Sequence, residues 1–496
     1  MKTNSDLGGT KLAVAVEPQV AAHPGESGLH PFSDGLDALA ARLIVADAAE
    51  RTLDVQYYIW KQDMVGRVLL ERLLRAADRG VKVRMLLDDF GTAPSDAVLL
   101  AIDSHPNIEV RMFNPITIRS LRALGIVADF RRTNRRMHNK SFTADGQVSI
   151  IGGRNIGNEY FEASDGYNHA DLDMAAIGPV VNEVAAAFEL FWNHRTAVPV
   201  SKFSRQPTTP EEFAVKRAGL IEHYTTAVRS EYADTVRGSE FARQFQDGAV
   251  TWFWSPAAIE NDHPEKVLTC TRKDETHLAP KLRELVHKTE SELFLVTPYF
   301  VAGKNGLALL AGVRQRGARV VVITNSLAST NSLPVHSGYR RYRRALLEAG
   351  VELYEIKPTA SSQRQRSGGG WFGSIGSSGS GGSGSSSGWS SLHAKAFAFD
   401  RRVGFVGSYN LDPRSNRLNT EMGVIFECPD LAKRLPEEAE KDLAHTAYRV
   451  ELDGPRLVWV TYDGDKEVRH TSEPACSRLR RFKVRVISCL PIEWML

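Results

Sequence analysis

Residues 138–155 read HNKSFTADGQVSIIGGRN, and residues 393–410 read HAKAFAFDRRVGFVGSYN. Both stretches fit His-x-Lys, four residues, Asp, six residues, Gly-Gly/Ser-x-Asn. A single His-x-Lys is usually surface decoration and a single Gly-Gly-x-Asn is usually a turn, but a doubled six-position pattern is hard to explain in that way. Two matched sets of histidine, lysine and asparagine predict one site built from two similar halves.

The residue types of the doubled pattern suit a bound phosphate. The apolar runs VSIIGG and VGFVGS indicate strands. Alternate residues of a strand share one face, so each histidine is expected to project beside its lysine. The glycine-rich turn lets backbone N–H groups approach an anion. The expected phosphate-binding residues are Lys140, Lys395, Asn155, Asn410, Gly153 and Ser408.

The two histidines can divide the chemistry of phosphodiester cleavage. One neutral imidazole attacks phosphorus to form phosphohistidine, and the other, protonated, donates to the departing oxygen. Lysine and asparagine side chains balance the charge, so neither a metal nor another cofactor is expected. Asp145 and Asp400 belong to the same catalytic pattern, although each is expected to fix its local turn and lysine rather than to touch substrate.

Each catalytic imidazole is expected to have a carboxylate on its second nitrogen. Asp173 in HADLDMAAIG and Glu421 in LNTEMGVIF stand at the start of similar apolar strands in the two halves, and we predict that they orient the histidines. A solvated carboxylate at a strand end is the alternative for each.

The doubled pattern resembles the HKD signature of the phospholipase D superfamily, from about Ser33 to the C-terminus. RRMHNK, LFLVTPYFV and LPIEWML resemble bacterial cardiolipin synthases, particularly their C-type branch. The resemblance implies a phosphatidyl transferase that moves a phosphatidyl group from a donor lipid to phosphatidylglycerol. It assigns His138 as nucleophile and His393 as general acid and base, although near symmetry leaves the reverse order open. Phosphatidylethanolamine is a further candidate lipid.

Two groups of residues are candidates for binding a lipid headgroup. FRRTNRRMHNK places Arg135 and Arg136 just before the first motif, and arginine binds phosphate oxygens in a bidentate manner. His336 and Tyr339 resemble positions near the acceptor side of the synthases. A solvated charge run and ordinary helix packing are the respective alternatives.

Composition limits the partners. The chain has 496 residues with 42% hydrophobic and 24% charged residues, typical of a globular protein with two large domains. A net charge of +3 gives no basis for expecting a nucleic-acid partner. No apolar run reaches 18 residues, which predicts no transmembrane helix. For the lipid enzyme that the resemblance implies, we therefore expect either peripheral association with the bacterial inner membrane or an N-terminal anchor that is missing from this sequence. The alternatives are a hydrolytic phospholipase D or other phosphodiesterase, including a nuclease, and a non-catalytic lipid-binding scaffold.

The repeat extends upstream of both motifs and alternates helix and strand, which predicts an α/β fold of two similar phospholipase D-like lobes with mixed sheets. One chain would then carry a complete catalytic site as a monomer. Residues 359–390 form a Gly/Ser-rich insert that is expected to be flexible. The expected divisions are a flexible segment 1–32, a first lobe 33–200, a connection 201–277, a second lobe 278–435 and a small C-terminal addition 436–496.

Overall fold

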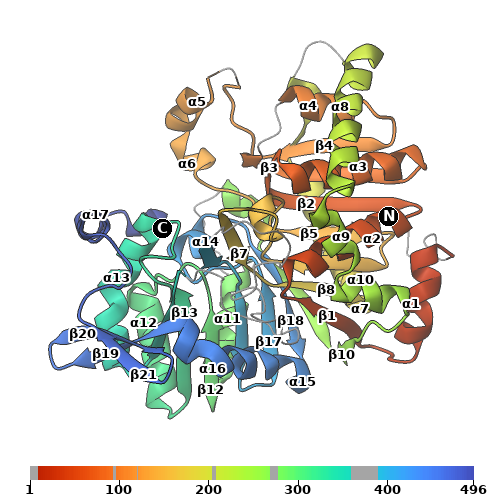
Figure 1. Ribbon diagram of the computed structural model, residues 1–496. Coiled ribbons are helices and arrows are strands. Elements are labelled where there is room, and N and C mark those ends of the chain that lie inside the picture. The colour runs from red at the N-terminus through yellow and green to blue at the C-terminus, as the bar shows by residue number, and fades with distance from the viewer. Residues whose placement is uncertain (1–8, 93–95, 120, 204–207, 269–276, 359–388) are drawn as a thin grey trace.

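Two mixed β-sheets form two lobes in the computed structural model (Figure 1). The structure describes residues 9–92, 96–119, 121–203, 208–268, 277–358 and 389–496. The first sheet runs β10 (Phe253–Ser255), β1 (Ser27–Phe32), β8 (Asp173–Ile177), β6 (Val148–Gly152), β5 (Ser141–Ala144), β2 (Thr52–Trp60), β3 (Lys82–Thr92), β4 (Ile108–Phe113) and β9 (Ala197–Pro199). The second runs β11 (Ala257–Asn261), β18 (Met422–Glu427), β17 (Val403–Gly407), β16 (Ala396–Phe399), β12 (Glu292–Val296), β13 (Arg319–Asn325), β14 (Glu352–Ile356), β19 (Ala447–Asp453), β20 (Arg456–Asp463) and β21 (Lys466–His470).

Six strands follow one order in both sheets. β8-β6-β5-β2-β3-β4 in the first lobe corresponds to β18-β17-β16-β12-β13-β14 in the second. The last three strands of each set are parallel to one another, and the others pair antiparallel. This correspondence confirms the predicted α/β fold of two similar lobes in one chain.

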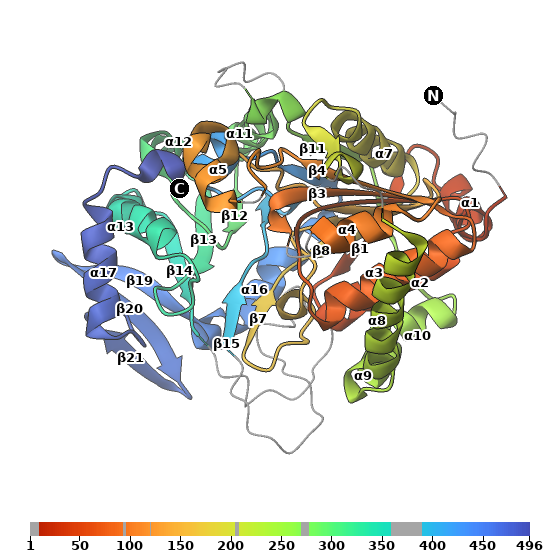
Figure 2. The same ribbon diagram turned by 90° about the horizontal axis from the view of Figure 1, so that it is seen from above.

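Helices pack around the two sheets (Figure 2). The first lobe and the connection carry α1 (Lys11–Ala21), α2 (Gly35–Ala48), α3 (Met64–Asp78), α4 (Asp96–Asp103), α5 (Arg122–Ala128), α6 (Phe130–Thr133), α7 (Pro179–Trp192), α8 (Pro210–Val228), α9 (Glu231–Arg237) and α10 (Glu240–Gln246). The remainder carries α11 (Leu278–Lys288), α12 (Gly303–Gln315), α13 (Leu333–Glu348), α14 (Pro413–Arg417), α15 (Pro429–Ala432), α16 (Arg434–Thr446) and α17 (Arg478–Ser488). Among the described residues, no helix has the length and apolarity needed to cross a bilayer.

The central strands are apolar on both faces because helices cover both. In β3, Leu86 packs with Phe188 of α7, whereas Leu87 belongs to the core that α3 helps to form. The residues MLL of this strand are therefore all buried, as expected for a strand with two covered faces. Asp63 caps the N-terminus of α3, where its side chain accepts a hydrogen bond from the backbone N–H of Gly66.

The two lobes share one hydrophobic core. Ile151 of β6 and Met174 of β8 belong to the same buried cluster as Val406 of β17 and Val424 of β18. The matching strands of the two halves therefore face each other across the pseudo-twofold axis. Burial of this apolar surface holds the lobes together and fixes their relative position.

The expected divisions of the chain differ from the structure at several points. In place of a flexible segment 1–32, residues 11–21 form α1 and residues 27–32 form β1 inside the first sheet. The connection supplies one strand to each sheet, β10 and β11. The C-terminal addition joins the second lobe, because β19, β20 and β21 extend the second sheet. The insert lies outside the described residues apart from its last two.

Candidate active site

A short backbone pairing places each motif histidine against the opposite lobe. β15 (Trp389–Leu392) pairs parallel with β7 (Tyr167–Ala170), and the N–H of His393 donates to the Ala170 carbonyl at 2.7 Å. Met137 bridges Thr420 in the same sense, and the N–H of His138 donates to the Thr420 carbonyl at 2.9 Å. Each motif histidine therefore lies beside the segment that precedes β8 or β18 of the other lobe.

Each histidine meets a buried carboxylate of the other lobe. Nδ1 of His138 lies 2.7 Å from Oε2 of Glu421, and Nδ1 of His393 lies 2.5 Å from Oδ2 of Asp171. A carboxylate accepts, so each pair places the ring proton on Nδ1 and leaves Nε2 free to react with phosphorus or to carry a second proton. The predicted contact of Glu421 with a histidine is present in the geometry.

The prediction that Asp173 orients a histidine is wrong. Its Oδ2 accepts from Arg42 at 2.7 Å, and its Oδ1 accepts from the backbone N–H of Arg154 at 3.1 Å. Gly152 pairs with Asp173 just as Gly407 pairs with Gly423, so Asp173 corresponds to Gly423. The counterpart of Glu421 is therefore Asp171, two residues earlier.

The electrostatics of the paired rings favour neutral imidazoles in the free protein. Burial, followed by the charges of Lys140 and Lys395, holds the pKa of His138 well below its usual value. Burial and Lys395 lower the pKa of His393 to about 3. Burial alone would raise the pKa of Asp171, but the charge and hydrogen bond of His393 and the charge of Lys395 hold it well below its usual range. The lysines of both halves thus act on one shared site.

The two lysines are fully enclosed. Nζ of Lys140 donates to the carbonyl of His138 at 2.6 Å. Nζ of Lys395 donates to the carbonyl of His393 and lies 3.2 Å from Nε2 of that ring. Burial lowers the pKa of Lys140 to about 7 and that of Lys395 to about 8. A bound phosphate would stabilise both ammonium groups, because burial opposes their charge and the nearby carboxylates of Asp171 and Glu421 offset that cost only in part.

The asparagines and the small residues of the motifs lie at the same place. Asn155 accepts from the N–H of Ile59 at 3.2 Å, while its Nδ2 is buried without a partner among the described residues. Asn410 lies in the matching turn and is 5% exposed. A side chain at Gly153 would overlap the carboxylate of Asp171, whereas Ser408 donates to Glu421 at 2.5 Å.

Asp145 and Asp400 stand away from the reacting groups, which corrects their place among the catalytic residues. The carboxylate of Asp145 accepts from the N–H groups of Arg51 and Thr52, at 2.8 and 2.9 Å. Asp400 accepts from Ser291 and Glu292 in the corresponding turn. Each aspartate lies five positions after its lysine, roughly 15 Å along extended chain, so the aspartates fix the turns before β2 and β12 and do not hold the lysines.

The four predicted headgroup residues are engaged inside the protein. Arg136 is 2% exposed and donates to the Asn114 carbonyl at 2.6 Å, while Arg135 donates to the Lys266 carbonyl at 2.9 Å. His336 and Tyr339 are 3% and 2% exposed. They belong to a buried cluster with Arg343, Glu355 and Glu473. These internal contacts favour a packing role for the four residues over the predicted headgroup binding.

A third histidine went unnoticed in the sequence. The ring of His169 lies 4.9 Å from that of His393, and Tyr160 lies 4.8 Å from His169 and 5.3 Å from His393. His169 is 5% exposed, and its Nδ1 has no hydrogen-bond partner among the described residues. The available signal was its spacing, because His169 and Asn419 precede the two carboxylates by two positions each.

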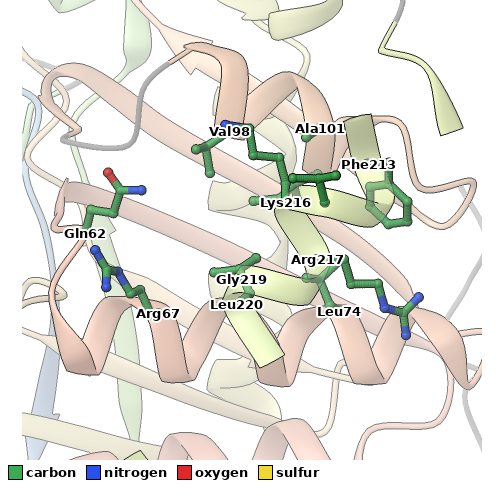
Figure 3. Close-up of a pocket in the computed structure, with 12 residues that line it drawn as sticks. Gln62, Arg67, Leu74, Val98, Ala101, Phe213, Lys216, Arg217, Gly219 and Leu220 are labelled. Atoms are coloured by element: carbon green, nitrogen blue, oxygen red, sulfur yellow. The ribbon is translucent and has the colours of Figure 1, made fainter. Parts of the chain in front are cut away.

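A cavity of about 280 Å³ lies elsewhere, between α3, α4 and α8 (Figure 3). Leu74, Phe213 and Leu220 supply its apolar lining, with Arg67 and Lys216 among its charged residues. No histidine of the doubled motif lines it. Within the described ranges, no cluster of three or more His, Cys, Asp or Glu side chains is arranged to hold a metal ion.

Comparison with known proteins accords with this geometry. A family model described as cardiolipin synthase, PLD-like domain, matches residues 43–192 and 282–443. The chain belongs to this family. Its two matched segments correspond to the two lobes, and each contains one motif.

Full-length relatives support the PLD-like family assignment. The chain is 41% identical to cardiolipin synthase C of Escherichia coli (strain K12), over 98% of this chain and 100% of that protein. It is 30% identical to an uncharacterized protein of Helicobacter pylori (strain ATCC 700392 / 26695), over 98% of this chain and 91% of that one. The crystal structure of phosphatidylserine synthase of Haemophilus influenzae Rd KW20 shares the fold, with a TM-score of 0.58, 12% identity and coverage of 98% and 100%.

Proposed function

We propose that the protein is a cardiolipin synthase-type phosphatidyl transferase that uses phosphatidylglycerol as acceptor. The observation that carries the proposal is the pair of histidine–carboxylate contacts, each made across the lobes and flanked by a buried lysine. The 41% identity to a cardiolipin synthase along the whole chain supports the choice of acceptor. Phosphatidylethanolamine and a second phosphatidylglycerol are the candidate donors.

In the proposed reaction the Nε2 atoms, which face away from the carboxylates, carry the chemistry. Nε2 of His138 attacks the phosphorus of the donor lipid, the bond to the headgroup oxygen breaks, and His393 gives its Nε2 proton to that oxygen. A hydroxyl of phosphatidylglycerol then attacks phosphorus, passes its proton back to His393, and the bond between phosphorus and His138 breaks. The lipid gains a phosphatidyl group and both rings return to their starting state.

Substrate binding supplies the protonation state that this reaction needs. The free rings are neutral, which suits a nucleophile but not a general acid. An anionic phosphate close to the rings and lysines raises their pKa values and favours an imidazolium at His393, whose Nδ1 proton stays on the ring and is donated to Asp171. Lys140, Lys395, Asn155 and Asn410 supply donors to the phosphate oxygens as charge moves to the leaving group.

Product analysis tests the proposal. Purified protein is incubated with labelled phosphatidylglycerol, with and without phosphatidylethanolamine, and the lipids are separated. Cardiolipin is the expected product, and it should disappear in His138→Ala and His393→Ala. Phosphatidic acid as the sole product would replace transfer by hydrolysis. Turnover that is unchanged in both variants would not come from this site, and the protein would then be a lipid-binding scaffold.

The mode of action expected in the cell follows from the same proposal. Both half-sites come from one chain, so a monomer is expected to be catalytically complete. The enzyme is expected to act peripherally at the inner membrane, where its lipid substrates reside. Sedimentation of the active protein checks the first point, and membrane fractionation before and after a high-salt wash checks the second.

A further inference from the structure

Large apolar side chains stand exposed along one face of α17. Leu479, Phe482 and Val486 are 60%, 62% and 48% exposed, and their spacing places them on one side of the helix. Leu490 and Trp494 continue the strip beyond the helix, at 46% and 53% exposed. The sequence RLRRFKVRVIS has five basic residues and no acidic residue. α17 therefore combines an exposed apolar face with a cationic border.

A second group of exposed apolar side chains lies on α5 and α6. Leu121, Leu124 and Val127 are 62%, 55% and 75% exposed, and Phe130 at the start of α6 is 39% exposed. The same segment also carries the basic residue Arg131, whereas its Arg122 and Arg132 are paired with Asp89 and Asp129. α6 ends at Thr133, and the chain then runs directly to His138 of the site.

The C-terminus joins these two groups. Arg414 donates to the Asn134 carbonyl at 2.9 Å, just after α6, and its own N–H donates to the Leu496 carbonyl at 2.5 Å. Tyr342 of α13 donates to Glu493 at 2.8 Å and fixes the turn between α17 and the last residue. In both views α5, the C-terminus and α17 follow one another along the same side of the molecule (Figures 1 and 2).

We propose that α5–α6, α17 and the C-terminal turn form one docking surface for an anionic lipid bilayer. Monomeric soluble proteins seldom expose several large apolar side chains in one region without a partner. An apolar face bordered by lysine and arginine fits the interface of a bilayer, where the apolar side chains enter the acyl boundary and the cations meet phosphate groups. The proposal deepens the proposed function, because the surface sits beside the segment that leads to His138.

The charge pattern selects the bilayer over a second copy of the chain. A self-complementary interface would juxtapose the basic residues of α17 with those of a symmetry mate, and like charges across an interface are unfavourable. Anionic headgroups satisfy the same residues without that conflict. The bilayer occupant therefore predicts binding that depends both on apolar side chains and on the anionic lipid fraction.

Vesicle binding by variants of α17 tests the proposal. The double variant Leu479→Asp/Phe482→Asp removes two exposed side chains from the docking surface. Its affinity for vesicles of phosphatidylglycerol and phosphatidylethanolamine should fall about 100-fold, since each inserted side chain contributes roughly a tenfold factor. Val215→Asp on α8 is the matched control, because Val215 is 71% exposed on an element outside the surface; its binding should equal that of the wild type. Wild-type binding should also weaken when phosphatidylcholine replaces phosphatidylglycerol.

Turnover of short-chain phosphatidylglycerol below its micelle concentration separates the two proposals. The double variant should match the wild type on this soluble substrate and lose activity on vesicles. If the double variant binds vesicles with wild-type affinity, the proposed docking surface is wrong, whatever the turnover of the variant. A wild-type dimer that dissociates in the variant, with vesicle binding retained, would overturn it in favour of self-association. Normal vesicle binding without turnover of any lipid would instead defeat the proposed function.

Discussion

Replacing Asp171 and Asp173 one at a time separates the histidine partner from a structural carboxylate two residues away. Asp171→Asn keeps the size of the side chain but offers an amide to Nδ1 of His393, 2.5 Å from the carboxylate in the structure. The amide NH₂ group favours the ring tautomer with its proton on Nε2. Asp173→Asn instead removes the partner of Arg42, whose guanidinium is 2.7 Å away.

Asp171→Asn is expected to affect mainly kcat, and Asp173→Asn mainly the free energy of unfolding. In a comparable histidine–aspartate pair, an amide in place of the carboxylate costs about 10⁴-fold in kcat, and we expect 10²- to 10⁴-fold for Asp171→Asn. Its stability should change by about 1 kcal/mol, because the ring keeps a polar neighbour. Asp173→Asn leaves Arg42, whose side chain is 2% exposed, without its anion. Breaking such a buried pair costs about 3–5 kcal/mol.

Two measurements resolve the pair of variants. Thermal unfolding of Asp173→Asn should begin several degrees below the wild type, while its turnover at low temperature stays within about threefold of the wild type. Asp171→Asn should unfold near the wild-type temperature and lose turnover. Loss of turnover in a stable Asp173→Asn protein, together with an active Asp171→Asn protein, would refute the register argument that assigns Asp171 to His393.

Three further outcomes are expected. Asp145→Asn should lower the free energy of unfolding by about 1.5–3 kcal/mol, because it weakens charge-assisted hydrogen bonds to the turn before β2. Its kcat at 25 °C should stay within about threefold of the wild-type value. A variant that is stable but inactive would contradict the structural role. His169→Asn places at this position the residue found at Asn419 in the second lobe. It should lower kcat about 10²-fold with KM unchanged and narrow the pH profile of kcat, because the unpartnered ring nitrogen of His169 lies beside His393. An unchanged kcat would mean that His169 serves only in packing. The pKa values of Lys140 and Lys395 are lowered to about 7 and 8, so above about pH 7 the unfolded chain binds more protons than the ligand-free protein, and the free energy of unfolding should rise with pH toward the ordinary lysine pKa. Binding of short-chain phosphatidylglycerol near pH 8 should therefore take up protons, which calorimetry in buffers of different ionisation enthalpy measures. No proton uptake would mean that the lysines stay charged throughout.

The sequence predicted the features that repeat in its two halves. It did not predict contacts that depend on strand register or on residues of the opposite lobe. The doubled His-x-Lys pattern and the matching helix–strand order predicted the two-lobed fold. Asp173 was chosen because it opens an apolar strand, yet a shift of two residues in a β-strand keeps the same face, so alternation alone cannot separate Asp171 from Asp173. Arg136 and His336 were candidates for headgroup binding, but a carbonyl and a buried carboxylate on distant segments pair with them. Such pairings are fixed by tertiary contacts, which no local pattern encodes.

The exchange of carboxylates across the lobes explains why the doubled motif lies within one chain that has a common core. Asp171 serves the histidine of the second motif and Glu421 that of the first, so neither lobe alone would hold a correctly oriented imidazole. A shift of about an ångström between the lobes would break both contacts at once, since hydrogen bonds weaken steeply beyond about 3.2 Å.

The two halves of the site are nevertheless built differently. Glu421 is held by the hydroxyls of Ser408 and Ser415, at 2.5 and 2.7 Å, whereas Asp171 is shorter and faces Gly153. In the second lobe Asn419 accepts from the N–H of Arg136, whereas Nδ1 of the matching His169, beside His393, has no hydrogen-bond partner among the described residues. One histidine thus has a carboxylate fixed by two hydroxyls, and the other has a second ring within reach. This asymmetry is consistent with the proposed roles, in which the fixed ring, His138, attacks phosphorus and His393, beside a second imidazole, carries out acid–base transfer.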